Sequence, residues 1–115
     1  MKYMFLIFRS EEALQAMPKE SRNEMFAAYG AYTGALKKAG VMVSGDPLQA
    51  ASTATTVRVA KGKTQVLNGP YAEIKEQLGG YYVVDVPDLD AALSWAARCP
   101  GASAGAIEVR PLMAM

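Results

Sequence analysis

The spacing of apolar and polar residues along the chain predicts an alternation of strands and helices. Runs with strand-like spacing occur at residues 2–8, 41–49, 55–60, 64–67, 80–86 and 105–112. The first run, KYMFLIF, is apolar on both sides of a period-2 strand, which indicates that both of its faces are covered. The runs at 55–60 and 64–67 are joined by Lys61-Gly62-Lys63, and a short glycine-containing connection of this kind predicts a hairpin.

Helical spacing dominates two segments. Residues 17–40 repeat apolar side chains every three or four positions, in a stripe made by Met25, Tyr29, Tyr32, Leu36 and Ala39. Gly30 and Gly34 are unfavourable inside such a helix, so we expect them to let its backbone approach the sheet closely. A second helix is predicted over 87–101, with Asp88 as N-cap and a stripe of Leu89, Ala92, Leu93 and Ala96. Residues 73–78 are expected to form one helical turn.

The order of these elements predicts the fold class. A strand, a long helix, further strands, a second helix and a last strand make the ferredoxin-like, split βαβ arrangement of an α+β protein with an antiparallel sheet. Since 115 residues amount to one domain, we treat residues 1–115 as a single unit.

Two helices can cover only one face of this sheet. By alternation Tyr82, Val84 and Val86 belong under the helices, while Tyr81 and Asp85 point to the other face, and the last strand likewise sends Glu108 and Arg110 there. That helix-free face would be half apolar and half ionisable. We therefore predict a homodimer in which two such faces pack into a dimeric α+β barrel and enclose a cleft.

Composition removes several function classes. A formal net charge of +1 and the absence of a polybasic run argue against direct nucleic-acid or membrane-surface binding. The chain has no histidine, so His-based catalysis and His-ligated metals are excluded, and no metal or cofactor is expected. Cys99 is the single cysteine, which rules out an intramolecular disulfide and favours a cytoplasmic location. At a helix end before proline, Cys99 is interpreted as inert packing.

The segment NGPYAEIKEQLGGYYVVDVPDLDAALSWAAR, with the N-terminal MKYMFLIF and the C-terminal EVRPL, resembles the YCII-related proteins of the DGPF type. The resemblance covers nearly the whole chain. It implies a dimeric α+β barrel built from ferredoxin-like subunits. It also implies either small-molecule chemistry in a dimer cleft, as in a dehydrochlorinase of aromatic degradation, or association with sigma factors of the extracytoplasmic-function class.

Two positions depart from the family pattern. Asn68 stands where the family turn usually begins with Asp, and Tyr29-Gly30 replaces a frequent His-Gly pair. Both changes remove a group that titrates at or below neutrality, since asparagine is not a base and tyrosine has a pKa near 10. Acid–base chemistry at those two positions is therefore in question.

Candidate site residues follow from the helix-free face and the turn beside it. Asp85 and Arg110 are the candidate catalytic pair, in which Arg110 would bind a carboxylate while Asp85 takes a proton. The candidate ligand-binding residues are Tyr29, Asn68, Glu73, Lys75, Tyr81 and Glu108. Each also has a structural interpretation: a turn for Asn68, a solvated surface for Glu73 and Lys75, core packing for Tyr29, and a salt bridge between Asp85 and Arg110 inside the dimer.

Two functions of different class remain. The first is a small dimer that binds a small organic molecule in its cleft and acts as a cofactor-free lyase or isomerase-like enzyme. The second is a non-catalytic accessory or regulatory domain that works through protein contacts, for example with a sigma factor. The loss of titratable groups at positions 29 and 68 favours the second function, whereas the charged groups of the helix-free face favour the first.

Overall fold

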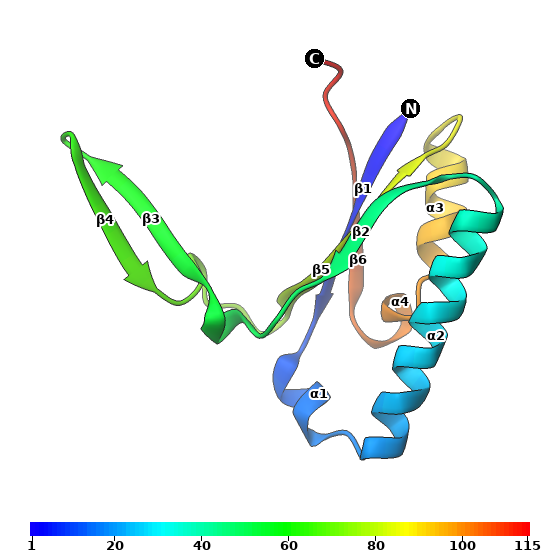
Figure 1. Ribbon diagram of the computed structural model, residues 1–115, viewed down its shortest axis with the longest axis horizontal. Coiled ribbons are helices and arrows are strands. Elements are labelled where there is room, and N and C mark those ends of the chain that lie inside the picture. Colours follow the sequence, from blue (N-terminus) through cyan, green and yellow to red (C-terminus); the bar gives the residue numbers. More distant parts are fainter.

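A computed structural model describes all residues, 1–115, and shows an α+β body from which a two-stranded hairpin projects (Figure 1). The elements in chain order are β1 (Lys2–Arg9), α1 (Glu11–Ala16), α2 (Lys19–Lys38), β2 (Met42–Pro47), the 3₁₀ turn η1 (Ala51–Thr53), β3 (Thr55–Ala60), β4 (Lys63–Asn68), β5 (Gln77–Asp85), α3 (Leu89–Arg98), α4 (Gly101–Ala104) and β6 (Ala106–Pro111).

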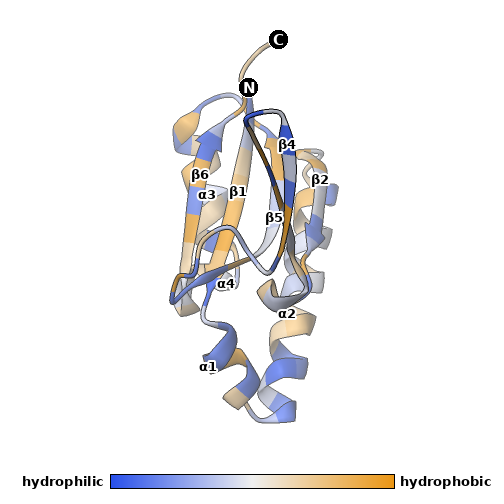
Figure 2. Cartoon of the chain, turned by 90° about the vertical axis from the view of Figure 1, so that its left-hand side faces the viewer, coloured by the Kyte–Doolittle hydropathy of each residue, from blue (hydrophilic) through white to orange (hydrophobic).

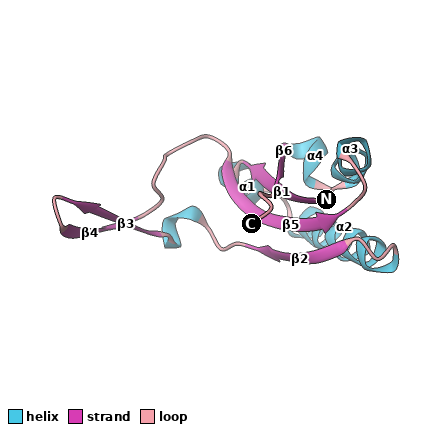
Figure 3. Cartoon of the chain, turned by 90° about the horizontal axis from the view of Figure 1, so that it is seen from above, coloured by secondary structure: helices cyan, strands magenta, loops and turns pink.

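The body is a four-stranded antiparallel sheet in the order β2-β5-β1-β6. The first strand of the chain is thus central, between β5 and the last strand β6. Helices α2 and α3 lie side by side on one face of this sheet, as Figure 3 shows from above. The predicted α+β fold with a ferredoxin-like antiparallel sheet is confirmed.

The core lies between the sheet and these helices. Phe5 of β1, Leu36 of α2 and Val84 of β5 are fully buried there. The alternation predicted from the sequence holds, because Tyr82, Val84 and Val86 are buried under the helices while Asp85 is exposed. The Tyr32 hydroxyl crosses this layer and donates a hydrogen bond to the Trp95 carbonyl at 2.7 Å, which ties α2 to α3.

The opposite face of the sheet carries no helix. Figure 2 looks onto this face and shows the apolar strand β1 running down its centre, with α2 and α3 behind the sheet. By alternation Met4, Leu6 and Phe8 of β1 point to this side, and all three are half-buried. A substantial apolar surface of the sheet is therefore left without a layer over it.

The predicted hairpin forms and stands apart from the body. Lys61 and Gly62 at its turn have φ values of 51° and 74°, the two positive values that a type I′ turn requires. Strands β3 and β4 pair with each other from Thr55↔Asn68 to Ala60↔Lys63. The radius of gyration of the chain is 16.0 Å, whereas a compact domain of this length has about 13 Å, so the hairpin is a protruding arm.

Three local predictions are wrong. Residues 73–78 form no helical turn, because residues 71–76 are irregular and β5 already begins at Gln77. Gly30 and Gly34 do not touch the sheet, since nothing lies within 4 Å of a Cβ built on either, and both are exposed. Leu89 and Leu93 of α3 are also exposed, because only the alanine side of that helix faces the core.

Alanine substitutions at Gly34 and Gly45 are expected to change the free energy of unfolding in opposite directions. Gly34→Ala is expected to raise the free energy of unfolding by about 1 kcal/mol, because alanine favours an exposed helix interior over glycine. Gly45→Ala is expected to lower it by about 2 kcal/mol, because the new methyl would meet the Tyr82 ring at 2.6 Å and the Tyr81 carbonyl at 3.0 Å. Urea unfolding of the two variants checks both. Two losses of similar size would contradict the exposed placement of Gly34.

None of the helices has both the length and the apolar character that a membrane-spanning segment requires.

Candidate functional site

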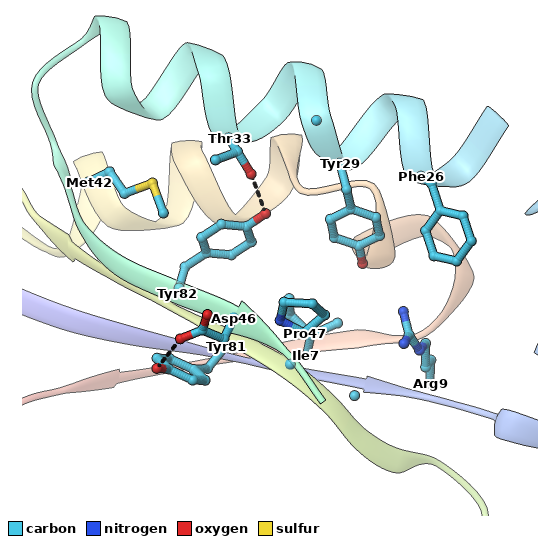
Figure 4. Close-up of a pocket in the computed structure, with 14 residues that line it drawn as sticks. Ile7, Arg9, Phe26, Tyr29, Thr33, Met42, Asp46, Pro47, Tyr81 and Tyr82 are labelled. Carbon is cyan, nitrogen blue, oxygen red and sulfur yellow. Dashed lines mark hydrogen bonds between the residues drawn. The ribbon is translucent and has the colours of Figure 1, made fainter. Parts of the chain in front are cut away.

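A cavity of about 340 Å³ opens between α2 and the β2 edge of the sheet, on the side that carries the helices (Figure 4). Its wall on the helix side is Phe26, Tyr29, Gly30 and Thr33 of α2. Its other walls come from the sheet, in a set that includes Ile7, Arg9, Met42, Gly45, Asp46, Pro47, Gly79, Gly80, Tyr81 and Tyr82. A volume of this size is within the range of small-molecule sites.

The Tyr29 side chain lines the cavity, and its hydroxyl reaches past the cavity to Gly101. The side chain descends from α2 in Figure 4, and a Cβ built on Gly101 at the start of α4 would lie 2.5 Å from the Tyr29 hydroxyl. This hydroxyl is buried and makes no hydrogen bond of good geometry, although the Cys99 thiol is close enough to interact with it. Burial raises the pKa of Tyr29 to about 12, with a further contribution from Cys99 that Arg9 partly opposes. At neutral pH Tyr29 is therefore a phenol that donates a hydrogen bond, not a base.

Arg9 lies at the end of β1 and supplies the positive charge of the cavity. The guanidinium lies flat against Gly79, where a Cβ would come within 2.7 Å of Arg9 Nε. The guanidinium therefore fits here only because residue 79 has no side chain. Arg9 Nε is buried without a hydrogen-bond partner, the second such group in the cavity. An unpaired buried donor costs about 1–3 kcal/mol, so both groups favour a ligand that accepts hydrogen bonds.

One hydrogen-bonded pair of side chains joins the helix wall of the cavity to its sheet wall. Thr33 Oγ1 and the Tyr82 hydroxyl share a hydrogen bond of 2.8 Å between α2 and β5. Burial raises the pKa of Tyr82, and the bond to Thr33 acts against that rise. Since Gly45 has no side chain, the Tyr82 ring packs directly on β2. This pair fixes the width of the cavity.

Asp46 is the one carboxylate among the residues that line the cavity, and it lies at the rim. Its Oδ2 accepts a hydrogen bond of 2.8 Å from the Tyr81 hydroxyl. Figure 4 places this pair on the other side of β2 from Tyr29 and Phe26. The hydrogen bond from Tyr81 to Asp46 raises the pKa of Tyr81. The lining residues thus supply two buried donors, whereas their one carboxylate lies across β2 from Tyr29 and is paired with Tyr81.

The sequence-predicted residues divide between this cavity and other places. Tyr29 and Tyr81 line it. The others lie outside it and are exposed: Asn68 at the end of β4, Glu73 and Lys75 in the connection to β5, Asp85, Glu108 and Arg110.

Asp85 and Arg110 do not pair with each other within one chain, because β1 lies between their strands. The N-terminal amine of Met1 binds Asp85 Oδ1 at 3.1 Å, and Arg110 binds Glu108 Oε2 at 2.9 Å on its own strand. Both pairs are solvent-exposed, which makes each worth little. The salt bridge between Asp85 and Arg110 stays a prediction for the dimer only.

Sequence reasoning missed Arg9, Asp46 and Gly79. The available signal was an arginine one residue beyond an apolar strand that the topology makes central. That signal needs the strand order, which spacing along the chain does not give. Cys99 is buried, and burial raises the pKa of its thiol, in agreement with packing.

No group of three or more histidine, cysteine, aspartate or glutamate side chains comes together in a way that would hold a metal ion.

Comparison with known proteins assigns the chain to a family. The family model described as the YCII-related domain matches residues 1–115. The chain belongs to the YCII-related family. One relative in this comparison is an uncharacterized protein of Rhizobium meliloti (strain 1021), which is 36% identical over 114 residues that cover 97% of this chain and 92% of that protein.

A solved structure extends the comparison to this YCII-related fold. It is the 5-chloro-2-hydroxyhydroquinone dehydrochlorinase of Burkholderia phenoliruptrix AC1100, in complex with 2,5-dihydroxybenzoquinone. The likeness has a TM-score of 0.57 at 19% sequence identity and covers 98% of this chain and 94% of that chain. At this identity the likeness establishes the shared fold.

Proposed function

We propose that this YCII-related protein binds a small planar organic molecule with acidic oxygens, of the hydroxyquinone or enol type, in the cavity between α2 and β2. The observation that carries the proposal is that Tyr29 and Arg9 both line one apolar cavity while the Tyr29 hydroxyl and Arg9 Nε are buried without a good hydrogen-bond partner, so that a small turn of either side chain would offer a donor to a ligand. A ligand oxygen held by a phenol and a guanidinium satisfies both. An anionic oxygen suits them best, because hydrogen bonds to charged groups are about twice as strong as neutral ones.

The apolar walls fit a flat ring. Phe26, Ile7, Met42 and Pro47 surround the cavity, and a volume of about 340 Å³ suits a single six-membered ring with its substituents. The structural neighbour is a dehydrochlorinase that carries 2,5-dihydroxybenzoquinone. That ligand is planar and has oxygens on opposite edges, so its class matches what the donors and the walls of this cavity favour.

The same groups support a lyase-like reaction. A carboxylate takes the proton of an enol whose double bond adjoins the saturated carbon that carries the leaving group, and the resulting oxyanion is stabilised by Arg9 and the Tyr29 hydroxyl. The electron pair on oxygen then forms the carbonyl and shifts the double bond, while a leaving group departs with its bonding pair from the conjugated saturated carbon. The net change is loss of a proton and the leaving group. Asp46 is the proton acceptor in this proposal, because it is the one carboxylate among the lining residues, and to act it must leave the Tyr81 hydroxyl and turn toward the cavity.

The homodimer is part of this proposal. The half-buried apolar residues Met4, Leu6 and Phe8 on the helix-free face support it, since monomers rarely leave such a patch in water. In the dimer Asp85 and Arg110 would lie at the interface rather than at the cavity. Sedimentation velocity at micromolar concentration measures the association state directly, and a stable monomer contradicts this part.

Calorimetric titration with 2,5-dihydroxybenzoquinone tests the binding site. Arg9→Gln is expected to weaken binding by about 10-fold to 100-fold, and Tyr29→Phe by about 10-fold, because each removes one donor from the anionic oxygen. Gly79→Ala is expected to act like Arg9→Gln, because its methyl group displaces a flexible side chain and leaves the backbone in place.

Matched controls use the same residue types away from the cavity. Arg98→Gln on α3 removes a cation that stacks on Trp95 at 4.2 Å, and Tyr71→Phe changes an exposed ring. Neither should alter the affinity. If the two control variants weaken binding as much as the three cavity variants do, or the wild-type protein shows no binding, the cavity proposal fails. Absence of binding favours the accessory domain that contacts a sigma factor.

A further inference from the structure

The arm formed by β3 and β4 presents apolar side chains that nothing in its own chain covers. Val57, Val59 and Val66 are 60%, 68% and 62% exposed. The register Val57↔Val66 and Val59↔Thr64 places these three valines on one face of the hairpin. An isolated two-stranded hairpin is at best marginally stable in water, so this face needs a covering surface.

The base of the arm is fixed to the body, which sets where the arm points. The backbone N–H of Ala51 in η1 donates to both carboxylate oxygens of Glu11 at 2.9 Å. Leu48 N–H donates to the Gly79 carbonyl of β5 at 2.9 Å, while the bond from Gly69 N–H to the Ala54 carbonyl at 2.7 Å closes the hairpin itself at its base. From this base the arm leaves on the helix-free side, and Figures 1 and 3 show open space between it and the sheet.

Charge distinguishes the arm from the rest of the chain. Residues 55–68 contain Arg58, Lys61 and Lys63 and no acidic residue, a formal charge of +3. With +1 on the whole chain, the other residues carry a formal charge of −2. The arm is therefore complementary in charge to the body of this same protein.

We infer that the arm clasps a second copy of this chain, with its Val57–Val59–Val66 face against that copy's body and Lys61 and Lys63 beside its carboxylates. The inference rests on the homodimer in the proposed function and adds the contact that holds it. Dimer formation would cover both the helix-free face of the sheet and the valine face of the arm. A second body that packs against the helix-free face lies next to the arm. A two-fold axis repeats both contacts, so the interface closes on itself.

Zero-length carbodiimide cross-linking of a mixture of unlabelled and ¹⁵N-labelled full-length protein tests the contact. The expected result is mixed-isotope peptide pairs that join Lys61 or Lys63 to an Asp or Glu of the other copy's body. Lys37 and Lys38 at the end of α2 serve as internal controls, since they are exposed lysines on the helix side. If a dimer sediments but arm cross-links are absent or only same-isotope, the clasp is wrong and the homodimer stands. If the protein sediments as a monomer, both are wrong.

A variant measures the contribution of the valine face. Val57→Thr, Val59→Thr and Val66→Thr together keep β-branched side chains, so the hairpin retains its propensity while the apolar surface is lost. The dimer dissociation constant, from sedimentation equilibrium, is expected to rise at least about tenfold. Gln65→Thr on the opposite face of β4 is the control and should leave it unchanged. Equal dissociation constants for the triple variant and the control would overturn the assigned face of the arm.

Discussion

Phe5→Ala is expected to lower the free energy of unfolding by about 3–5 kcal/mol, the largest loss that we predict for any single substitution. Phe5 is 0% exposed and lies on the central strand, where it pairs with Tyr82 on one side and Val109 on the other. Truncation of Phe5 leaves a cavity in the core, because β5, β6 and the helix layer cannot all move inward to fill the space. Since a domain of this kind has only about 5–15 kcal/mol in total, much of its stability would go.

Urea unfolding of Phe5→Ala beside Leu93→Ala gives the comparison. Leu93 was predicted from helical spacing to be buried, yet it is 46% exposed on α3. Its truncation should cost less than about 1 kcal/mol. Similar losses for the two variants would mean that α3 packs through its leucine side, contrary to the structure.

Stability is expected to fall steeply in alkaline solution. Burial raises the pKa of Tyr29 to about 12, and it also raises the pKa of Tyr32, of Tyr82 and of the Cys99 thiol. The native state therefore keeps protons that the unfolded chain releases from about pH 9 for the thiol and about pH 10 for the phenols. The stabilisation is complete below these values and is lost as the pH rises toward about 12.

Unfolding free energies at pH 8, 10 and 11 measure this slope. Each such group adds up to about 1.4 kcal/mol per pH unit. Tyr29→Phe and Tyr32→Phe should each flatten the slope, whereas Tyr71→Phe, which changes an exposed ring, should not. Tyr32→Phe also loses the bond to the Trp95 carbonyl, but that loss is a constant offset and leaves the slope as the readout. A slope that the buried-tyrosine variants do not change contradicts the assigned cause.

Much of the fold could be predicted from residue spacing. Tyr82, Val84 and Val86 alternate with Asp85, and this pattern assigned the two faces of β5 correctly. The short connection Lys61-Gly62-Lys63 predicted the hairpin, because glycine readily takes the positive φ that such a turn requires. These features are local, so the sequence around them carries the information.

The cavity was harder to predict because it depends on contacts between distant segments. Arg9 meets Gly79 only when β1 pairs with β5, and Tyr29 reaches Gly101 only when α2 covers the sheet. Gly30 and Gly34 misled for the opposite reason, since glycine in a helix indicates a close approach but does not say to what. The prediction that charged residues mark the site led to Asp85 and Arg110, whereas the cavity is mostly apolar and its donors are few.

The central position of β1 has a consequence for synthesis. Its partners are residues 77–85 and 106–111, so β1 is made well before both of the strands that pair with it. At about 5–20 residues per second, this apolar strand stays unpaired for on the order of ten seconds while the ribosome makes the residues up to β6. Nascent chains that stall before residue 106 would therefore be the ones that chaperones hold and proteases remove.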